Sequence, residues 1–156
     1  MFDRRHALRI SCIVTLLLAA ANAAAGLPAD EQAAVFKAAG FERGADGRYI
    51  RCQEETPTAS YTPGAIEEVD VNGDGQAEAL VTEGSMFCYG SPHTFFGLVA
   101  KGAGGWKLLL DDVGIPVVLE TRHGGWVDIE VGGPGFGKFP VWQWDGSAYQ
   151  RVTPAQ

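Results

Sequence analysis

The chain has 156 residues, a formal net charge of −7 and 46% hydrophobic residues. This length suits one domain after a targeting segment, and the apolar content is sufficient for a packed core. An acidic surface repels nucleic acid and anionic lipid, so the charge argues against functions that depend on binding either of them. It remains compatible with cations and with basic protein partners.

The N-terminus has the pattern of a secretory signal peptide. Three arginines precede an apolar run from Ile10 to Ala21, which is too short to span a bilayer. Small residues follow and favour cleavage after Ala25, with cleavage after Ala23 as the alternative. We expect a signal peptide over residues 1–25 and a single β-rich domain over residues 26–156. The product would be periplasmic or secreted, with a net charge of −9 and no membrane insertion after cleavage.

One helix is predicted, directly after the cleavage site. Asp30 can cap its N-terminus, and an alanine-rich run continues it to Ala39. Gly40 stands where a left-handed residue ends a helix, and Phe41 supplies the closing apolar contact.

The remainder reads as strands joined by turns. Strands are expected over residues 47–52, 65–71 and 77–82, and hairpins over 95–101 with 106–111, 116–121 with 126–131, and 139–144 with 148–152. The predicted fold class is α+β, with the helix packed on one curved, mainly antiparallel sheet of about seven to nine strands.

Alternation assigns faces to two of these strands. Trp106, Leu108 and Leu110 are expected to share one face. Val127, Ile129 and Val131 are expected to be buried, opposite a face that carries Trp126, Asp128 and Glu130.

The sharpest chemical signal lies between Val69 and Val81. Oxygen-bearing residues recur there with glycines that allow a tight loop, and the predicted ligands are Asp70, Asn72, Asp74, the Gln76 carbonyl and Glu78. A hard cation such as Ca²⁺ requires oxygen ligands of this kind. An EF-hand needs a bidentate glutamate at the twelfth position, which is Val81 here, and flanking helices, so that fold is excluded.

The loop resembles the calcium loops of FG-GAP/VCBS-type β repeats, in which an Asp-x-Asn/Asp-x-Asp-Gly-x-x-Asp/Glu run joins two strands. The resemblance covers about a dozen residues in one copy and implies a calcium-binding β-hairpin with a structural role. The alternative is that Asn72-Gly73 and Asp74-Gly75 are turn dipeptides in a polar loop. Three carboxylates that converge without a cation would repel one another, which favours the metal.

Two cysteines remain after cleavage, Cys52 and Cys88. An even pair in an oxidising compartment predicts a disulfide. The alternative is a hydrolase in which Cys88 is the nucleophile and His93 the base. Hydrolysis by a carboxylate pair is a further form of this alternative, with Glu67/Glu68, Asp111/Asp112 and Asp128/Glu130 as the candidate pairs.

Aromatic residues are numerous in the second half. Trp126, Phe136, Trp142 and Trp144 could form a surface for a protein or a glycan, although core packing is their ordinary role. The predicted function is therefore an exported, non-enzymatic binding or structural module with a calcium loop. An inhibitor or immunity protein with a basic enzyme partner would be one member of this class.

Overall fold

The computed structural model describes residues 26–53, 61–135 and 138–152. These ranges contain two helices and ten strands in three antiparallel sheets, so the predicted α+β class is confirmed. The predicted signal segment and Phe136 lie outside the described residues.

The elements follow one another closely along the chain. They are α1 (Ala29–Ala38), β1 (Glu42–Arg43), β2 (Tyr49–Ile50), β3 (Thr62–Val69), β4 (Glu78–Gly84), α2 (Met86–Tyr89), β5 (Thr94–Gly102), β6 (Gly105–Val113), β7 (Ile115–His123), β8 (Trp126–Gly132), β9 (Val141–Trp144) and β10 (Tyr149–Val152). The three predicted hairpins are β5–β6, β7–β8 and β9–β10.

Helix α1 ends as the sequence predicts but begins differently. Gly40 has φ +80°, its N–H donates to Lys37 O, and the Phe41 N–H donates to Phe36 O at 2.9 Å. These two bonds form a Schellman motif, which satisfies the last carbonyls of the helix. The Asp30 cap is wrong, because Pro28 holds the N-cap position and Asp30 lies in the first turn. A carboxylate there still interacts favourably with the helix dipole.

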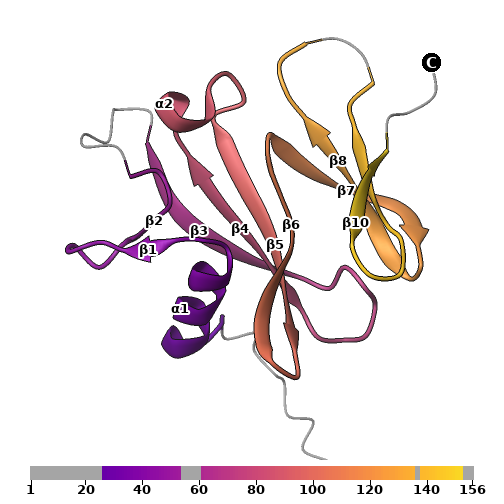
Figure 1. Cartoon of the computed structure of the whole chain (residues 1–156), viewed down its shortest axis with the longest axis horizontal. Helices are drawn as coiled ribbons and strands as arrows, with labels where there is room; N and C mark the ends of the chain where they lie inside the picture. Colours follow the sequence, from indigo (N-terminus) through magenta and orange to yellow (C-terminus); the bar gives the residue numbers. More distant parts are fainter. Residues whose placement is uncertain (1–25, 54–60, 136–137, 153–156) are drawn as a thin grey trace, which may run out of the picture.

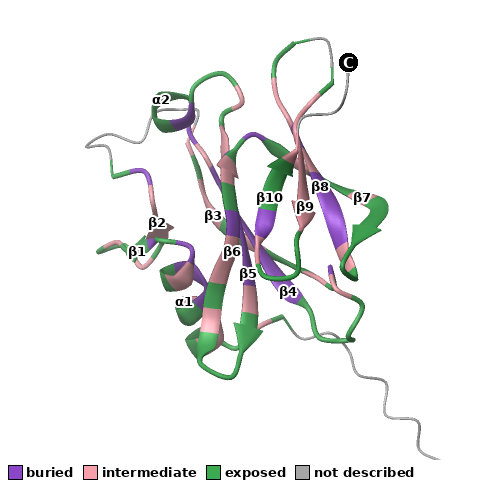
Figure 2. Ribbon diagram, turned by 45° about the vertical axis from the view of Figure 1, so that its right-hand side comes forward, coloured by how far each residue is buried: buried purple, intermediate pink, exposed green. Residues whose placement is uncertain are grey.

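The layers are α1, a middle sheet and an outer sheet (Figure 1). The middle sheet has the strand order β3-β4-β5-β6, and the outer sheet has the order β10-β9-β8-β7. One core lies between α1 and the middle sheet and includes Val35, Phe36, Val81, Phe95 and Val99. The second core lies between the two sheets and includes Leu80, Phe96, Leu98, Ile129 and Val131. Strands β4 and β5 are therefore buried on both faces (Figure 2).

The expectation of one continuous sheet is wrong, and Gly114 is the physical reason. This residue alone separates β6 from β7, at the point where the chain leaves the middle sheet for the outer one. Its φ is +155°, and a Cβ at this position would lie 2.4 Å from Cγ1 of Val131. Only glycine fits so close to the facing strand.

The predicted buried face of β8 is confirmed, whereas Asp128 on its opposite face is also buried and the face predicted for β6 is wrong. Val127, Ile129 and Val131 are all buried in the second core, as expected. On β6 the register shifts between the pairs Leu98–Leu110 and Val99–Leu108. Because such a bulge reverses the side-chain alternation, Trp106 and Leu108 pack on the α1 side, whereas Leu110 packs between the sheets.

Candidate functional site

The loop between β3 and β4 is closed by its own side chains. The Asp70 carboxylate accepts backbone N–H groups from Gly73 at 2.6 Å and Gly75 at 3.1 Å. Both glycines have positive φ, which allows the tight return of the chain. The hydrogen bond from Gly73 contributes most to lowering the pKa of Asp70.

Asn72 connects the two carboxylates at the centre of this loop. Its side-chain amide donates to Asp74 Oδ2 at 3.2 Å and to Glu78 Oε1 at 2.9 Å. The second Glu78 oxygen accepts the Val71 N–H at 3.0 Å. Glu78 is buried, and this burial raises the pKa of its carboxyl.

The loop carries oxygen ligands of the kind that Ca²⁺ prefers. In this structure, however, these oxygens accept hydrogen bonds from N–H groups of the same loop. Asn72 Oδ1 accepts the Asp74 N–H, and Asp74 Oδ1 accepts the Gln76 N–H. Across residues 26–53, 61–135 and 138–152, no group of three or more His, Cys, Asp or Glu side chains is arranged to hold a metal ion. A cation between Asp74 and Glu78 would have to replace the Asn72 amide, so calcium binding stays a prediction.

The loop is fastened to the outer sheet. The Val71 carbonyl accepts the Val127 N–H at 2.8 Å and Arg122 Nη1 at 3.2 Å. The same Arg122 nitrogen donates to Gly125 O in the β7–β8 turn. Val71 itself is fully buried. The loop and Trp126, which follows this turn, are therefore held side by side.

A groove of about 310 Å³ opens beside the loop. Three segments form its walls: the loop, the β5–β6 hairpin and Trp126 at the start of β8. The lining residues that matter most are Asn72, Asp74, Gln76, Lys101, Lys107, Leu109 and Trp126. The structure thus brings together predicted metal-loop residues and one predicted partner-surface residue.

The aromatic wall of this groove is fixed in place. Trp126 stacks on Trp144 with ring centroids 4.6 Å apart, and Tyr149 meets both rings edge-on. The Tyr149 hydroxyl donates to Val127 O at 2.9 Å. Trp126, Trp142 and Trp144 are each half-buried against the second core. Trp142 therefore packs in the fold, and its Nε1 donates to Asp112 at 3.3 Å.

The two lysines of the groove differ in their partners. Lys101 Nζ lies 2.6 Å from Glu31 Oε1, and Glu31 also accepts the Trp106 indole N–H. These hydrogen bonds lower the pKa of Glu31. Lys107 is exposed and makes no ion pair with any residue in the described ranges. Sequence reasoning missed both lysines, because their approach to the loop depends on the β5–β6 register.

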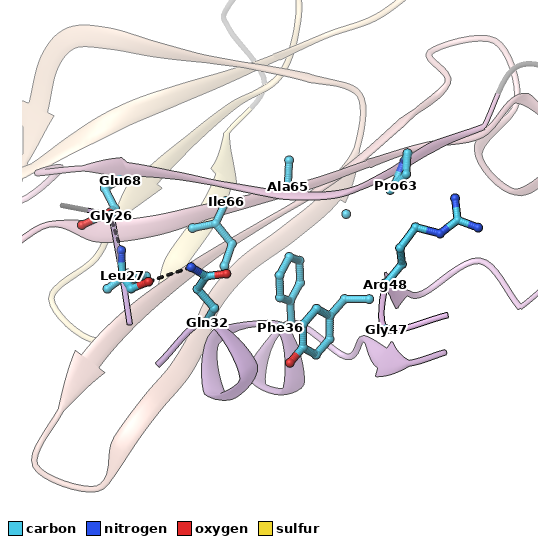
Figure 3. Close-up of a pocket in the computed structure, with 12 residues that line it drawn as sticks. Gly26, Leu27, Gln32, Phe36, Gly47, Arg48, Pro63, Ala65, Ile66 and Glu68 are labelled. Carbon is cyan, nitrogen blue, oxygen red and sulfur yellow. Dashed lines mark hydrogen bonds between the residues drawn. The ribbon is translucent and has the colours of Figure 1, made fainter. Parts of the chain in front are cut away.

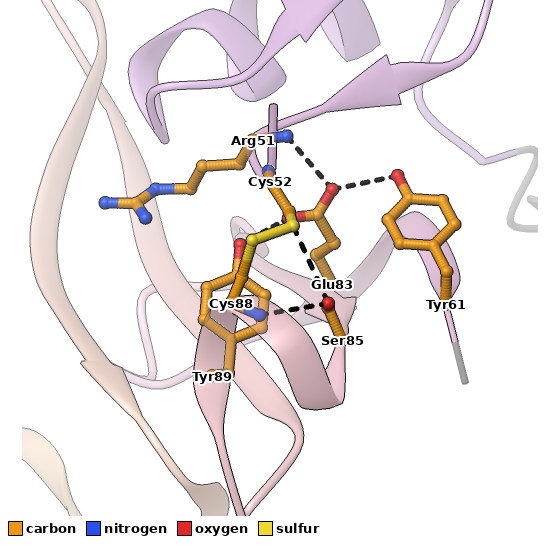
Figure 4. Close-up of a disulfide and its surroundings, with 7 residues drawn as sticks. All are labelled: Arg51, Cys52, Tyr61, Glu83, Ser85, Cys88 and Tyr89. Atoms are coloured by element: carbon orange, nitrogen blue, oxygen red, sulfur yellow. Dashed lines mark hydrogen bonds between the residues drawn. A yellow bond between two sulfur atoms is a disulfide. The ribbon is translucent and has the colours of Figure 1, made fainter. Parts of the chain in front are cut away.

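The predicted Cys52–Cys88 disulfide is present, with the two Cα atoms 5.9 Å apart. Glu83, buried beneath it, accepts backbone N–H groups from Arg51 and Cys52 and the hydroxyls of Tyr61 and Tyr89 (Figure 4). Burial, followed by the bond to Glu83, raises the pKa of Tyr61 to about 12 and that of Tyr89 further. Because Cys88 is in the disulfide, the Cys88/His93 hydrolase has no nucleophile in this structure.

Each predicted carboxylate pair has a member that is engaged in a structural contact. Glu68 accepts the Leu27 N–H at 3.0 Å, and Asp111 lies 3.7 Å from Arg51. Asp128 was expected on a solvated face but is buried.

Asp128 forms a polar group that sequence reasoning missed. It accepts Thr121 Oγ1, contacts His123 Nδ1 at 2.7 Å and accepts Gln143 Nε2. The register shift on β7 between Val118 and Arg122 hides this pairing in the sequence.

A second hollow, of about 410 Å³, lies between α1, β2 and β3 (Figure 3). Three of its polar side chains are already paired. Gln32 donates to Leu27 O, Glu68 accepts the Leu27 N–H, and Arg48 pairs with Asp46. Its aromatic wall is the Phe36–Tyr49 stack, which belongs to the first core. The loop groove differs because it includes Lys107, an exposed cation that makes no ion pair within the described ranges.

Two further findings bear on identity. No helix in the described ranges is both long and apolar enough to span a membrane. Comparison of the chain with protein-family models, curated proteins and solved structures found no match.

Proposed function

We propose that this chain is an exported, non-enzymatic binding module that holds a glycan in the groove beside the Asp70–Glu78 loop. The observation that carries the proposal is the convergence of Asp74, Lys107 and Trp126 on one groove from three separate segments. Ligand sites combine an apolar wall with a few placed polar groups, and a volume near 310 Å³ is at the small end of their range of roughly 300–1,000 Å³.

The lining chemistry favours a sugar over an apolar ligand. A sugar ring has apolar C–H faces, which the Trp126 indole and Leu109 can cover. Its hydroxyls both donate and accept, and they match the carboxylate of Asp74 and the amide of Gln76. Lys107 adds a cation for a hydroxyl or a sugar carboxylate.

The disulfide and a calcium ion in the loop would both support this function by stabilising the fold around the groove. A cross-link in an exported domain limits unfolding, and Ca²⁺ at Asp70–Glu78 would brace one groove wall. The disulfide is compatible with export, and we propose the periplasm or the cell exterior as the location.

Calorimetric titration tests this function with N-acetylglucosamine tetramer, maltotetraose and tetragalacturonate. At least one sugar should bind wild type, and Lys107→Ala or Gln76→Ala should weaken it by about tenfold, the effect of losing one or two hydrogen bonds. Both residues are exposed, so the variants should fold. Lys37→Ala, on α1, is the charge-matched control. Equal affinity in all variants would place binding elsewhere.

A further inference from the structure

The exposed large apolar side chains of the described residues gather in two segments. Met86 and Phe87 lie on α2, and Val113, Ile115, Val117 and Val118 lie where β6 passes into β7. Phe87 is the most exposed of them, at 66%. Figure 2 shows α2 and β7 largely exposed beside buried neighbouring strands.

The strand register places α2 and the β6–β7 junction at the same end of the middle sheet. Gly84, just before α2, pairs with Thr94, and Phe95 pairs with Val113. The Gly114 N–H also donates to Thr94 O at 2.8 Å. We call the surface formed by Met86, Phe87, Val113 and Ile115 the apolar end. It lies at the opposite end of β4 from the loop groove, since β4 begins at Glu78.

Helix α2 is held rigidly although its tip is exposed. The Ser85 side chain accepts the Cys88 N–H, and the Ser85 N–H donates to His93 O at 2.7 Å. Cys88 is tied to Cys52, and Tyr89 donates to the buried Glu83. A surface that is ordered before binding avoids the entropy cost of ordering on association. Met86 and Phe87 are therefore presented as fixed apolar projections.

The strands that meet at the β6–β7 junction are both edge strands. β6 is the last strand of the middle sheet, and β7 is the last strand of the outer sheet. Edge strands with exposed apolar side chains are sites where another protein can dock. Val117 and Val118 extend the apolar end along this edge.

The charge around this surface indicates the kind of partner. Asp112 precedes Val113 and Glu120 follows Val118 on β7, while the neighbouring Asp111 is already paired with Arg51 at 3.7 Å. Two copies of the chain meeting here would bring these carboxylates together, which disfavours a symmetric dimer. A partner with an apolar pocket and a basic rim matches both the side chains and the charge.

We propose that the apolar end docks a basic protein, with Phe87 and Met86 inserted into an apolar pocket of that protein. This proposal does not rest on glycan binding, because the groove residues lie at the other end of β4. It assigns the binding of a basic protein to a defined surface, with Phe87 and Met86 as the two anchor residues.

Photo-crosslinking in the producing cell tests the proposal. The photoreactive residue p-benzoylphenylalanine replaces Phe87 in one strain and the exposed Ala103 of the β5–β6 turn in a control strain. We expect a crosslink to a protein of basic isoelectric point from position 87 that is absent from position 103. With that protein purified, Phe87→Ser should weaken binding by about tenfold or more, as for a central anchor, whereas Lys37→Ala on the exposed side of α1 should leave it unchanged.

Three results would overturn the proposal. They are crosslinks from position 87 only to a second copy of the chain, the same products from positions 87 and 103, and no crosslinked protein from position 87. Because Phe87 is exposed, Phe87→Ser should melt like wild type, which separates lost binding from lost folding.

Discussion

The Asn72 side-chain amide donates a 2.9 Å hydrogen bond to the buried carboxylate of Glu78. The same amide reaches Asp74, so one neutral donor stands between two acidic groups. This arrangement relieves part of the repulsion that first suggested a cation. It also gives the loop a closed form that does not depend on metal.

Calcium should nevertheless stabilise the loop if its oxygens can turn toward an ion. Extracellular modules bind Ca²⁺ with dissociation constants of roughly 10⁻⁴–10⁻³ M. At ten times such a constant, mass action adds about 1.4 kcal/mol to the free energy of unfolding. We expect Ca²⁺ at about 10 mM to raise the melting temperature of wild type and not that of Asp74→Ala. Equal shifts of the melting temperature in both proteins, or a shift reproduced by Mg²⁺, would contradict a specific calcium site in this loop.

Gly114 should tolerate no side chain. In Gly114→Ala the new Cβ would meet Val131 Cγ1 at 2.4 Å and Gly132 O at 2.8 Å, at a φ that disfavours alanine. Overpacking of this kind costs roughly 1–3 kcal/mol, and the strained backbone adds to it. Urea unfolding should show this loss. Gly104→Ala is the matched control, because a Cβ added at Gly104 would have no neighbour within 4 Å; equal stability of the two variants would refute the close approach at Gly114.

Stability should fall at high pH through the tyrosines on Glu83. The folded-state pKa of Tyr61 is about 12, raised from an ordinary value of 10.0, so the folded state holds this proton more tightly than the unfolded state. The stabilisation of the folded state that results from this raised pKa is fully present below pH 10 and is lost as the pH rises toward about 12. Tyr89 acts in the same direction. Melting temperatures from pH 8 upward should decline less steeply in Tyr61→Phe than in wild type or Tyr49→Phe; parallel curves would contradict this.

Reduction of the disulfide should destabilise the fold without changing its sheets. Cys52 and Cys88 are 36 residues apart, and closing a loop of this length contributes roughly 3–4 kcal/mol in the chain-entropy model. Denaturant unfolding with and without a phosphine reductant measures the difference. A Cys52→Ala, Cys88→Ala double variant should show no response to the reductant. A free thiol in the oxidised wild-type protein would contradict the pairing itself.

Local signals in the sequence were sufficient for much of the fold. Gly40 and Phe41 marked the end of α1, and glycine-rich turns marked the hairpins. These features depend on residues close together in the chain, where turn and cap chemistry decide the outcome.

The failures came from contacts between distant segments. Gly114 looks like an ordinary linker glycine between two predicted strands until Val131 is placed against it. The bulge near Leu109 cannot be read from an apolar run that fits either face. Glu83 looks like a solvated strand residue, but donors from three separate segments surround it.

The candidate groove was predictable only in part. The loop composition singled out Asp74 and Gln76, and strand alternation singled out Trp126. Their convergence depends on Val71, whose carbonyl fastens the loop to the β7–β8 hairpin. Lys107 joins them through strand register, which composition and spacing do not determine.

The most direct test of the groove is a nuclear magnetic resonance titration of the ¹⁵N-labelled protein with the three sugars named above. The chain has four tryptophans, so each indole N–H can be followed separately. We predict that one sugar shifts the Trp126 indole and the Gln76 and Lys107 amides, while the Trp106 indole, bonded to Glu31, stays in place. No shift of the Trp126 indole with any sugar at about 10 mM would contradict glycan binding in this groove.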